Sequence, residues 1–108
     1  MADGLVLEVY RLTKRFPGEE RFGLQAQVRR AAVSVPTNIV EGSARTTTAE
    51  YCRFLTIATG SAAETHYLLS LSARLDMLPP SDAERLLEAY TVLLKSLKRL
   101  VIELQKRA

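Results

Sequence analysis

The chain has 108 residues, the size of one domain, and its 47% hydrophobic and 25% charged residues are ordinary for a globular protein. A single cysteine excludes an intrachain disulfide framework and a multi-cysteine metal site. No apolar run is long enough to span a bilayer and the first residues lack the pattern of a secretion signal, so we expect a cytoplasmic protein with no membrane partner. The formal net charge of +3 favours anionic partners only weakly.

Four helical segments are predicted along the chain, with Gly and Pro at the joints and no convincing strand. The first covers about 3–16 and has its apolar residues on one helical face, and Pro17 ends it. The second covers about 20–41. Pro36 is expected to kink or break it, and Gly42 is expected to end it in a left-handed cap.

The third segment, about 48–78, opens with a capping box formed by Thr47 and Glu50. Its apolar residues cover too wide an arc for packing on one side, so the helix is central in the bundle, or one face contacts a second subunit, or both. The fourth segment starts at a second capping box near Ser81 and carries a heptad of apolar residues. Short joints predict an all-α fold, an up-down antiparallel four-helix bundle that forms one domain over 1–108.

A polar stripe accompanies the apolar face on the second segment, and a matching stripe lies on the third. We call these residues the polar seam: Arg30, Ser34, Asn38 and Glu41 on the second segment, and Arg53, Gly60 and Glu64 on the third. They are predicted to meet along the contact between the two helices. The alternatives are a solvated charged face and a bridge between subunits.

One register of the two helices matches both stripes, because facing residues of an antiparallel pair have a constant sum of residue numbers. It pairs Arg30 with Glu64 and Glu41 with Arg53. The same register places Gly60 opposite a serine, where its small size would let the two backbones approach.

The stretches QVRRAAVSVPTNIVEGSAR (27–45) and EYCRFLTIATGSAAE (50–64) carry a resemblance to a known family. The sequence resembles the four-helix bundle proteins named after the protein encoded in intervening sequences of bacterial 23S ribosomal RNA. That family includes the accessory variability determinant of diversity-generating retroelements. The matching residues are Gln27, Arg29, Arg30, Ala31, Ser34, Asn38, Ile39, Glu41, Gly42, Phe54, Leu55, Ala58, Gly60, Ser61 and Glu64.

The resemblance implies a cytosolic bacterial protein without enzymatic activity, whose protomers form a closed ring, a homopentamer. For the retroelement branch it implies binding to nucleic acid and to a reverse transcriptase. The sequence departs from the family pattern after Glu64, at Thr65, His66 and Tyr67. The retroelement branch and the intervening-sequence branch therefore both stay open.

No catalytic constellation, metal site or cofactor is predicted. His66 is the only histidine and nothing around it singles it out, and Cys52 is interpreted as a small packing residue. Gly60 and Ser61 lack the strand-to-helix turn that would expose a nucleophile.

Basic residues cluster in two places. One cluster, on the last segment, is our candidate for phosphate contacts: Lys95, Lys98, Arg99, Lys106 and Arg107. The other, near the first joint, comprises Arg11, Lys14, Arg15 and Arg21. No set of aromatic residues suited to base stacking is expected to interleave them.

The leading hypothesis is an oligomeric scaffold, not an enzyme, that binds RNA, DNA or a nucleic-acid enzyme. A structural or protein-interaction bundle with incidental basic charge is the alternative, and an enzyme is the least favoured reading.

Overall fold

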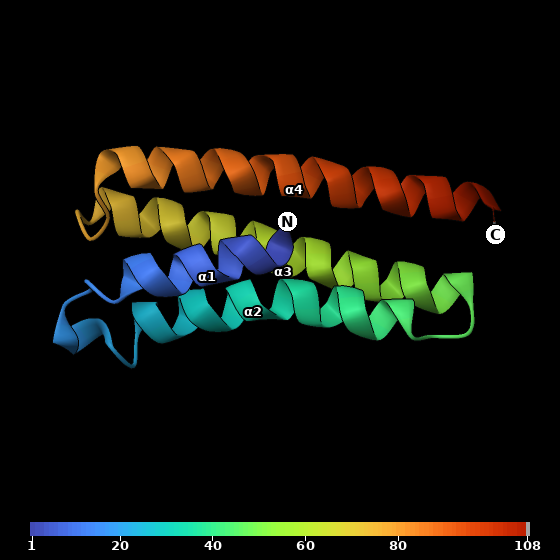
Figure 1. Cartoon of the computed structure of the whole chain (residues 1–108), viewed down its shortest axis with the longest axis horizontal. Helices are drawn as coiled ribbons and strands as arrows, with labels where there is room; N and C mark the ends of the chain where they lie inside the picture. Colours follow the sequence, from blue (N-terminus) through green and yellow to red (C-terminus); the bar gives the residue numbers. More distant parts are fainter. Residues whose placement is uncertain (108) are drawn as a thin grey trace.

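The computed structural model describes residues 1–107, and these form four α-helices and one short 3₁₀ helix, with no strand among them. The elements are α1 (Ala2–Thr13), η1 (Gly18–Glu20), α2 (Leu24–Ser43), α3 (Thr48–Arg74) and α4 (Pro80–Arg107). They lie side by side along a molecule of 46 × 23 × 18 Å (Figure 1). The predicted all-α helical bundle is confirmed. No helix within 1–107 combines the length and the apolar character needed to cross a membrane.

The core lies between α3 and its neighbours, because α3 packs along most of its length against α2 and α4. α1, with 12 residues, is much shorter than α3 and α4, which have 27 and 28. The largest completely buried side chains are Tyr90, Leu55, Leu69 and Leu86. α3 is thus central, yet its Ile57 remains 42% exposed in the single chain, and Leu75, directly after the helix, remains 52% exposed.

Pro36 does not break α2, which continues as one helix to Ser43. Proline removes one backbone donor and crowds the preceding turn, at a cost of about 3 kcal/mol in a helix interior. Two side chains add hydrogen bonds there: Thr37 Oγ1 donates to the carbonyl of Val33 at 2.8 Å, and Asn38 Nδ2 donates to the carbonyl of Ser34 at 2.8 Å. Burial of the apolar face on both sides of Pro36, at Val35 and partly at Ile39, favours a continuous helix.

The ends of α3 and α4 show which predicted caps form. Thr47 Oγ1 accepts a hydrogen bond from the backbone N–H of Glu50 at 3.2 Å, which confirms the start of α3. α3 ends at Arg74, before the predicted 78, because Asp76 adopts a left-handed conformation with φ of 60°. α4 begins at Pro80, so Ser81 lies within its first turn and is not the cap that was predicted.

Gly42 does not form the expected left-handed cap. α2 passes through it with ordinary helical backbone, and the residue is buried. A Cβ at this position would lie 2.8 Å from Phe54 Cβ and 2.9 Å from Tyr51 Cδ1. The absence of a side chain therefore lets the end of α2 pack against the start of α3.

Candidate functional site

The ion pair between Arg30 and Glu64 joins α2 to α3, as the register of the polar seam predicts. Arg30 Nη2 lies 2.6 Å from Glu64 Oε2. The two side chains are 62% and 41% exposed, so water screens the pair and its contribution to stability is small. The contact is confirmed, but it lies at the surface.

The middle of the polar seam is a partly buried hydrogen-bond network. Ser34 Oγ lies 2.8 Å from Ser61 Oγ across the two helices. Asn38 Nδ2 donates to the same Ser34 Oγ at 3.0 Å. Ser34 therefore meets Ser61, one position beyond Gly60, and these side chains satisfy one another without a charge.

The pairing of Glu41 with Arg53 is wrong, because neither residue forms an ion pair within residues 1–107. The Arg53 guanidinium instead lies over the Phe54 ring, 4.8 Å from its centroid, and Arg45 lies 4.7 Å from the same centroid. Cation–π contact with this ring replaces the expected carboxylate partner. Glu41 is exposed.

The close approach assigned to Gly60 is also wrong. Gly60 is exposed, and no neighbouring atom lies within 4 Å of the position a Cβ would take. The close contact between α2 and α3 is at Gly42 instead. Within the polar seam Arg30 contacts Glu64, and Ser34 and Asn38 form a separate network with Ser61, while Glu41, Arg53 and Gly60 make none of the predicted contacts.

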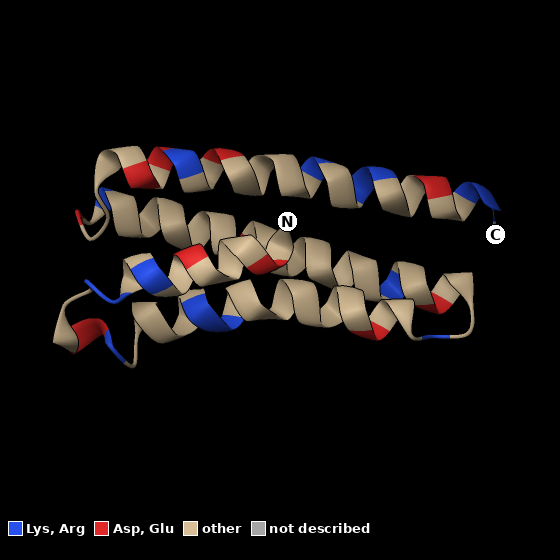
Figure 2. Ribbon diagram, in the orientation of Figure 1, with Lys and Arg blue, Asp and Glu red and all other residues tan. Residues whose placement is uncertain are grey.

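A basic face runs along the C-terminal half of α4 (Figure 2). All five residues proposed for phosphate contacts are exposed: Lys95, Lys98, Arg99, Lys106 and Arg107. Among these, only Lys106 is paired, with its Nζ 3.5 Å from Glu103 Oε1. Four of the five cations therefore have no acidic partner within the described part of the chain.

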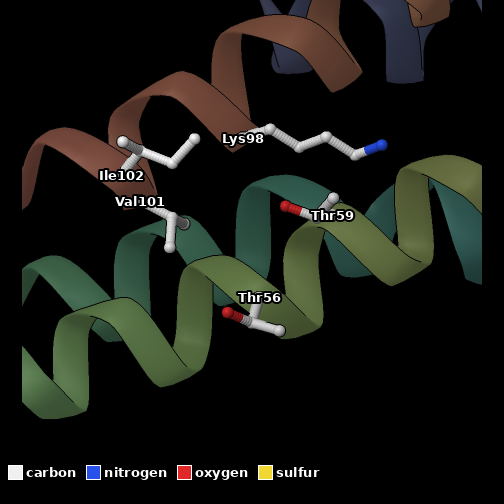
Figure 3. Close-up of a pocket in the computed structure, with 5 residues that line it drawn as sticks. All are labelled: Thr56, Thr59, Lys98, Val101 and Ile102. Atoms are coloured by element: carbon white, nitrogen blue, oxygen red, sulfur yellow. The ribbon is translucent and has the colours of Figure 1, made fainter. Parts of the chain in front are cut away.

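A shallow apolar hollow of about 310 Å³ lies between α3 and α4 next to this face. Thr56 and Thr59 come from α3, and Lys98, Val101 and Ile102 come from α4 (Figure 3). The Lys98 ammonium group points away from Val101 and Ile102, so its aliphatic stem borders apolar surface while its charge stays in water (Figure 3). The hollow carries no acid–base pair and no nucleophile suited to catalysis.

A second hollow, of about 450 Å³, lies at the opposite end of the bundle, beside the joint between α1 and α2. We call it the arginine–aromatic hollow; it is lined by Tyr10, Arg21, Phe22, Gln25, Ala26, Arg29 and Arg30. Tyr10 and Phe22 lie among basic residues here, whereas the sequence predicted no set of aromatic residues suited to base stacking. The signal in the sequence was the Arg21–Phe22 pair in a turn, where an apolar ring has no core to join.

Within residues 1–107, no group of three or more His, Cys, Asp or Glu side chains is placed to hold a metal ion. Cys52 is a free thiol that is only 9% exposed, in agreement with its interpretation as a packing residue.

Comparison with known proteins identifies the family to which this chain belongs. The sequence matches the family model of the 23S rRNA-intervening sequence protein over residues 1–99. No curated protein matches it. The crystal structure of a protein of unknown function from the S23 ribosomal protein family of Bacteroides thetaiotaomicron superposes with a TM-score of 0.85 at 25% identity, covering 93% of this chain and 94% of that one. The chain belongs to the family of 23S rRNA-intervening sequence proteins.

Proposed function

We propose that this protein is a non-enzymatic homo-oligomer, a closed ring of five protomers, that binds nucleic acid through the basic face of α4. The observation that carries the binding proposal is the exposure of Lys95, Lys98 and Arg99 on adjoining turns without an acidic partner. Phosphate groups are the natural counter-charge for such a face, and they carry no information about base sequence.

Self-association is supported by apolar side chains that the single chain leaves uncovered. α3 exposes Ile57 and Tyr67 at 42% and 56%, and Leu75, directly after its end, is 52% exposed. α4 exposes Val92 and Ile102 at 48% and 53%. Covering these faces with further copies would remove apolar area from water, and a head-to-tail contact that closes by rotation would give a ring.

A ring would also strengthen the electrostatic attraction. Each chain carries a formal charge of +3, so five copies would carry +15, five times the charge of one. The basic faces of α4 would then recur around the assembly, and a nucleic acid could contact several of them together.

Light scattering on a sizing column tests the assembly. We expect a mass near five times the 12.0 kDa of one chain. A monomer at micromolar concentration would refute self-association, and a clean dimer would refute the ring.

Fluorescence anisotropy with a labelled RNA and a labelled DNA duplex tests binding. We expect both to bind with little sequence preference, and the affinity should fall steeply as salt rises. Joint replacement of Lys95, Lys98 and Arg99 by alanine should weaken every sequence alike and flatten the salt dependence. The matched control replaces Arg85 by alanine, which removes a cation of α4 that is already paired with Glu8 and Asp82.

A protein-interaction scaffold is the second candidate, favoured by the same uncovered apolar faces of α3 and α4. Absence of RNA and duplex binding at low salt, with the oligomer intact, would shift the proposal to this role. In the retroelement branch the protein partner would be a reverse transcriptase, and co-purification with such an enzyme encoded beside the gene would test that assignment.

A further inference from the structure

The arginine–aromatic hollow presents an aromatic ring that contributes nothing to the core. Phe22 is 90% exposed, the highest fraction among the large hydrophobic side chains of residues 1–107. Tyr10, at the other side of the hollow, is 38% exposed. Two accessible rings thus line one concave surface at the joint of α1 and α2.

The backbone around Phe22 is held by hydrogen bonds, so the ring is presented from an ordered turn. The Gly23 N–H donates to the carbonyl of Glu20 at 3.2 Å, and the Arg21 N–H donates to the carbonyl of Gly18 at 3.2 Å. The Glu20 carboxylate accepts from the backbone N–H of Leu24 at 3.2 Å, which ties the turn to the start of α2. A platform built in this way needs little ordering when a ligand binds.

Hydrogen bonds to neutral groups hold the Arg29 side chain in place in the hollow. Its Nε donates to Thr13 Oγ1 at 2.9 Å and its Nη2 donates to the carbonyl of Tyr10 at 3.1 Å. Its guanidinium also lies 4.5 Å from the centroid of the Tyr10 ring. These partners are neutral, so the positive charge of Arg29 is oriented but not cancelled.

The other two arginines of the hollow differ in what they can bind. Arg30 is already paired with Glu64, which reduces its attraction for a further anion. Arg21 has no ion pair within residues 1–107, and its guanidinium lies 5.8 Å from the Phe22 ring centroid. The charges available to an anion are therefore those of Arg21 and Arg29.

We infer that the arginine–aromatic hollow binds a single-stranded segment of nucleic acid, with an unpaired base stacked on Phe22 and phosphate groups held by Arg21 and Arg29. Flat aromatic faces next to guanidinium groups recognise this combination of an exposed base and its backbone. A volume of about 450 Å³ is adequate for a nucleotide. Bases in a duplex are stacked on one another, so their faces cannot reach Phe22. The inference rests on the proposed function, but it adds a second site and a preference for single strands.

The first test measures anisotropy of labelled oligouridine, oligodeoxythymidine and a blunt DNA duplex with the full chain and its variants. Phe22→Ala should weaken both single strands by about 5- to 150-fold, the range found when a stacking aromatic residue is removed, and should leave the duplex within about twofold. Phe22→Tyr, which keeps the ring, should retain binding. Leu7→Ala, which removes another strongly exposed apolar side chain (72%) outside the hollow, is the matched control. The two single strands show whether the 2′-hydroxyl contributes.

The second test reports stacking directly. The chain contains no tryptophan, so Phe22→Trp introduces one fluorophore at the proposed platform. Single strands should quench this fluorescence on binding, and the duplex should not. Arg21→Ala should weaken single-strand binding and lower the salt slope by about one.

The outcomes separate this inference from the α4 proposal. Binding of single strands that is unchanged in Phe22→Ala and does not quench the introduced tryptophan overturns the hollow as a site, even if the triple variant of α4 loses affinity. If Phe22→Ala lowers the affinity for single strands and the triple variant of α4 does not, the hollow is supported as the binding site. The α4 face is then overturned as a binding site. If neither single strand binds at low salt with the oligomer intact, the inference fails, and any duplex binding then belongs to α4 alone.

Discussion

Gly42 packs so closely against Phe54 that an added Cβ would lie 2.8 Å from Phe54 Cβ. Phe54 Cβ is fixed to the α3 backbone and cannot swing away as the tip of a long side chain would. Gly42→Ala should therefore push α2 from α3 and destabilise the fold by about 1–3 kcal/mol, although alanine favours helix. Urea denaturation followed by circular dichroism measures the change.

Gly60→Ala is the matched control, because Gly60 also lies within a helix but has no neighbouring atom within 4 Å of its Cβ position. It should stabilise the protein by about 0.5–1 kcal/mol through the lower backbone entropy of the unfolded chain. If Gly60→Ala destabilises the protein as strongly as Gly42→Ala, another subunit must cover the outer face of α3.

The exposed Arg30–Glu64 pair should contribute little to stability. A double-mutant cycle with Arg30→Ala and Glu64→Ala should give a coupling free energy of about 0–1 kcal/mol, decreasing with added salt. The pair is 62% and 41% exposed, so neither residue leaves a buried charge when its partner is removed. A coupling above about 3 kcal/mol would show that assembly buries the pair, since such values belong to charges withdrawn from water.

The sequence predicts the number, type and approximate limits of the helices because apolar periodicity and the Thr47 cap are local signals. It also predicts that Arg30 faces Glu64, because this contact follows from the register of two antiparallel helices. The register alone could not predict the surroundings of Arg53, since it takes no account of the Phe54 ring over which the guanidinium lies. The sequence assigns the close approach to Gly60 and the structure places it at Gly42, because helix spacing gives no information on how closely two backbones approach.

The arginine–aromatic hollow shows the same limit of local signals. Its residues come from α1, the turn after η1 and α2, and no sequence period links Tyr10 with Phe22. Their position around one hollow depends on how α1 lies across α2. There Gln25 Nε2 donates to the carbonyl of Thr13 at 2.7 Å. Only the fold places these elements around one concavity.

At Asp76, in the loop between α3 and α4, glycine should give a more stable protein than alanine. Asp76 has φ of 60°, and the Met77 N–H donates to the carbonyl of Ser72 at 2.9 Å, so the residue ends α3 in a left-handed cap. Glycine adopts this backbone without steric cost, whereas alanine does not. Asp76→Gly and Asp76→Ala both remove the carboxylate, so their difference in unfolding free energy isolates the backbone effect. We expect glycine to be more stable by about 1–2 kcal/mol, and equal stability would contradict a strained φ.

Tyr90 should make the fold sensitive to alkaline pH. Its side chain is only 1% exposed, and burial raises the pKa of its phenol above the ordinary value near 10. Below pH 10 the phenol is protonated in both states and has no effect on pH dependence. Above pH 10 the unfolded chain loses this proton while the folded chain keeps it, so stability falls as pH rises, by at most about 1.4 kcal/mol per pH unit from this group.

Tyr90→Phe should flatten that decline in urea denaturation between pH 9 and 11. Tyr67→Phe, at a ring that is 56% exposed, is the matched control, and an equal slope in the wild type and Tyr90→Phe would show that the phenol ionises without unfolding.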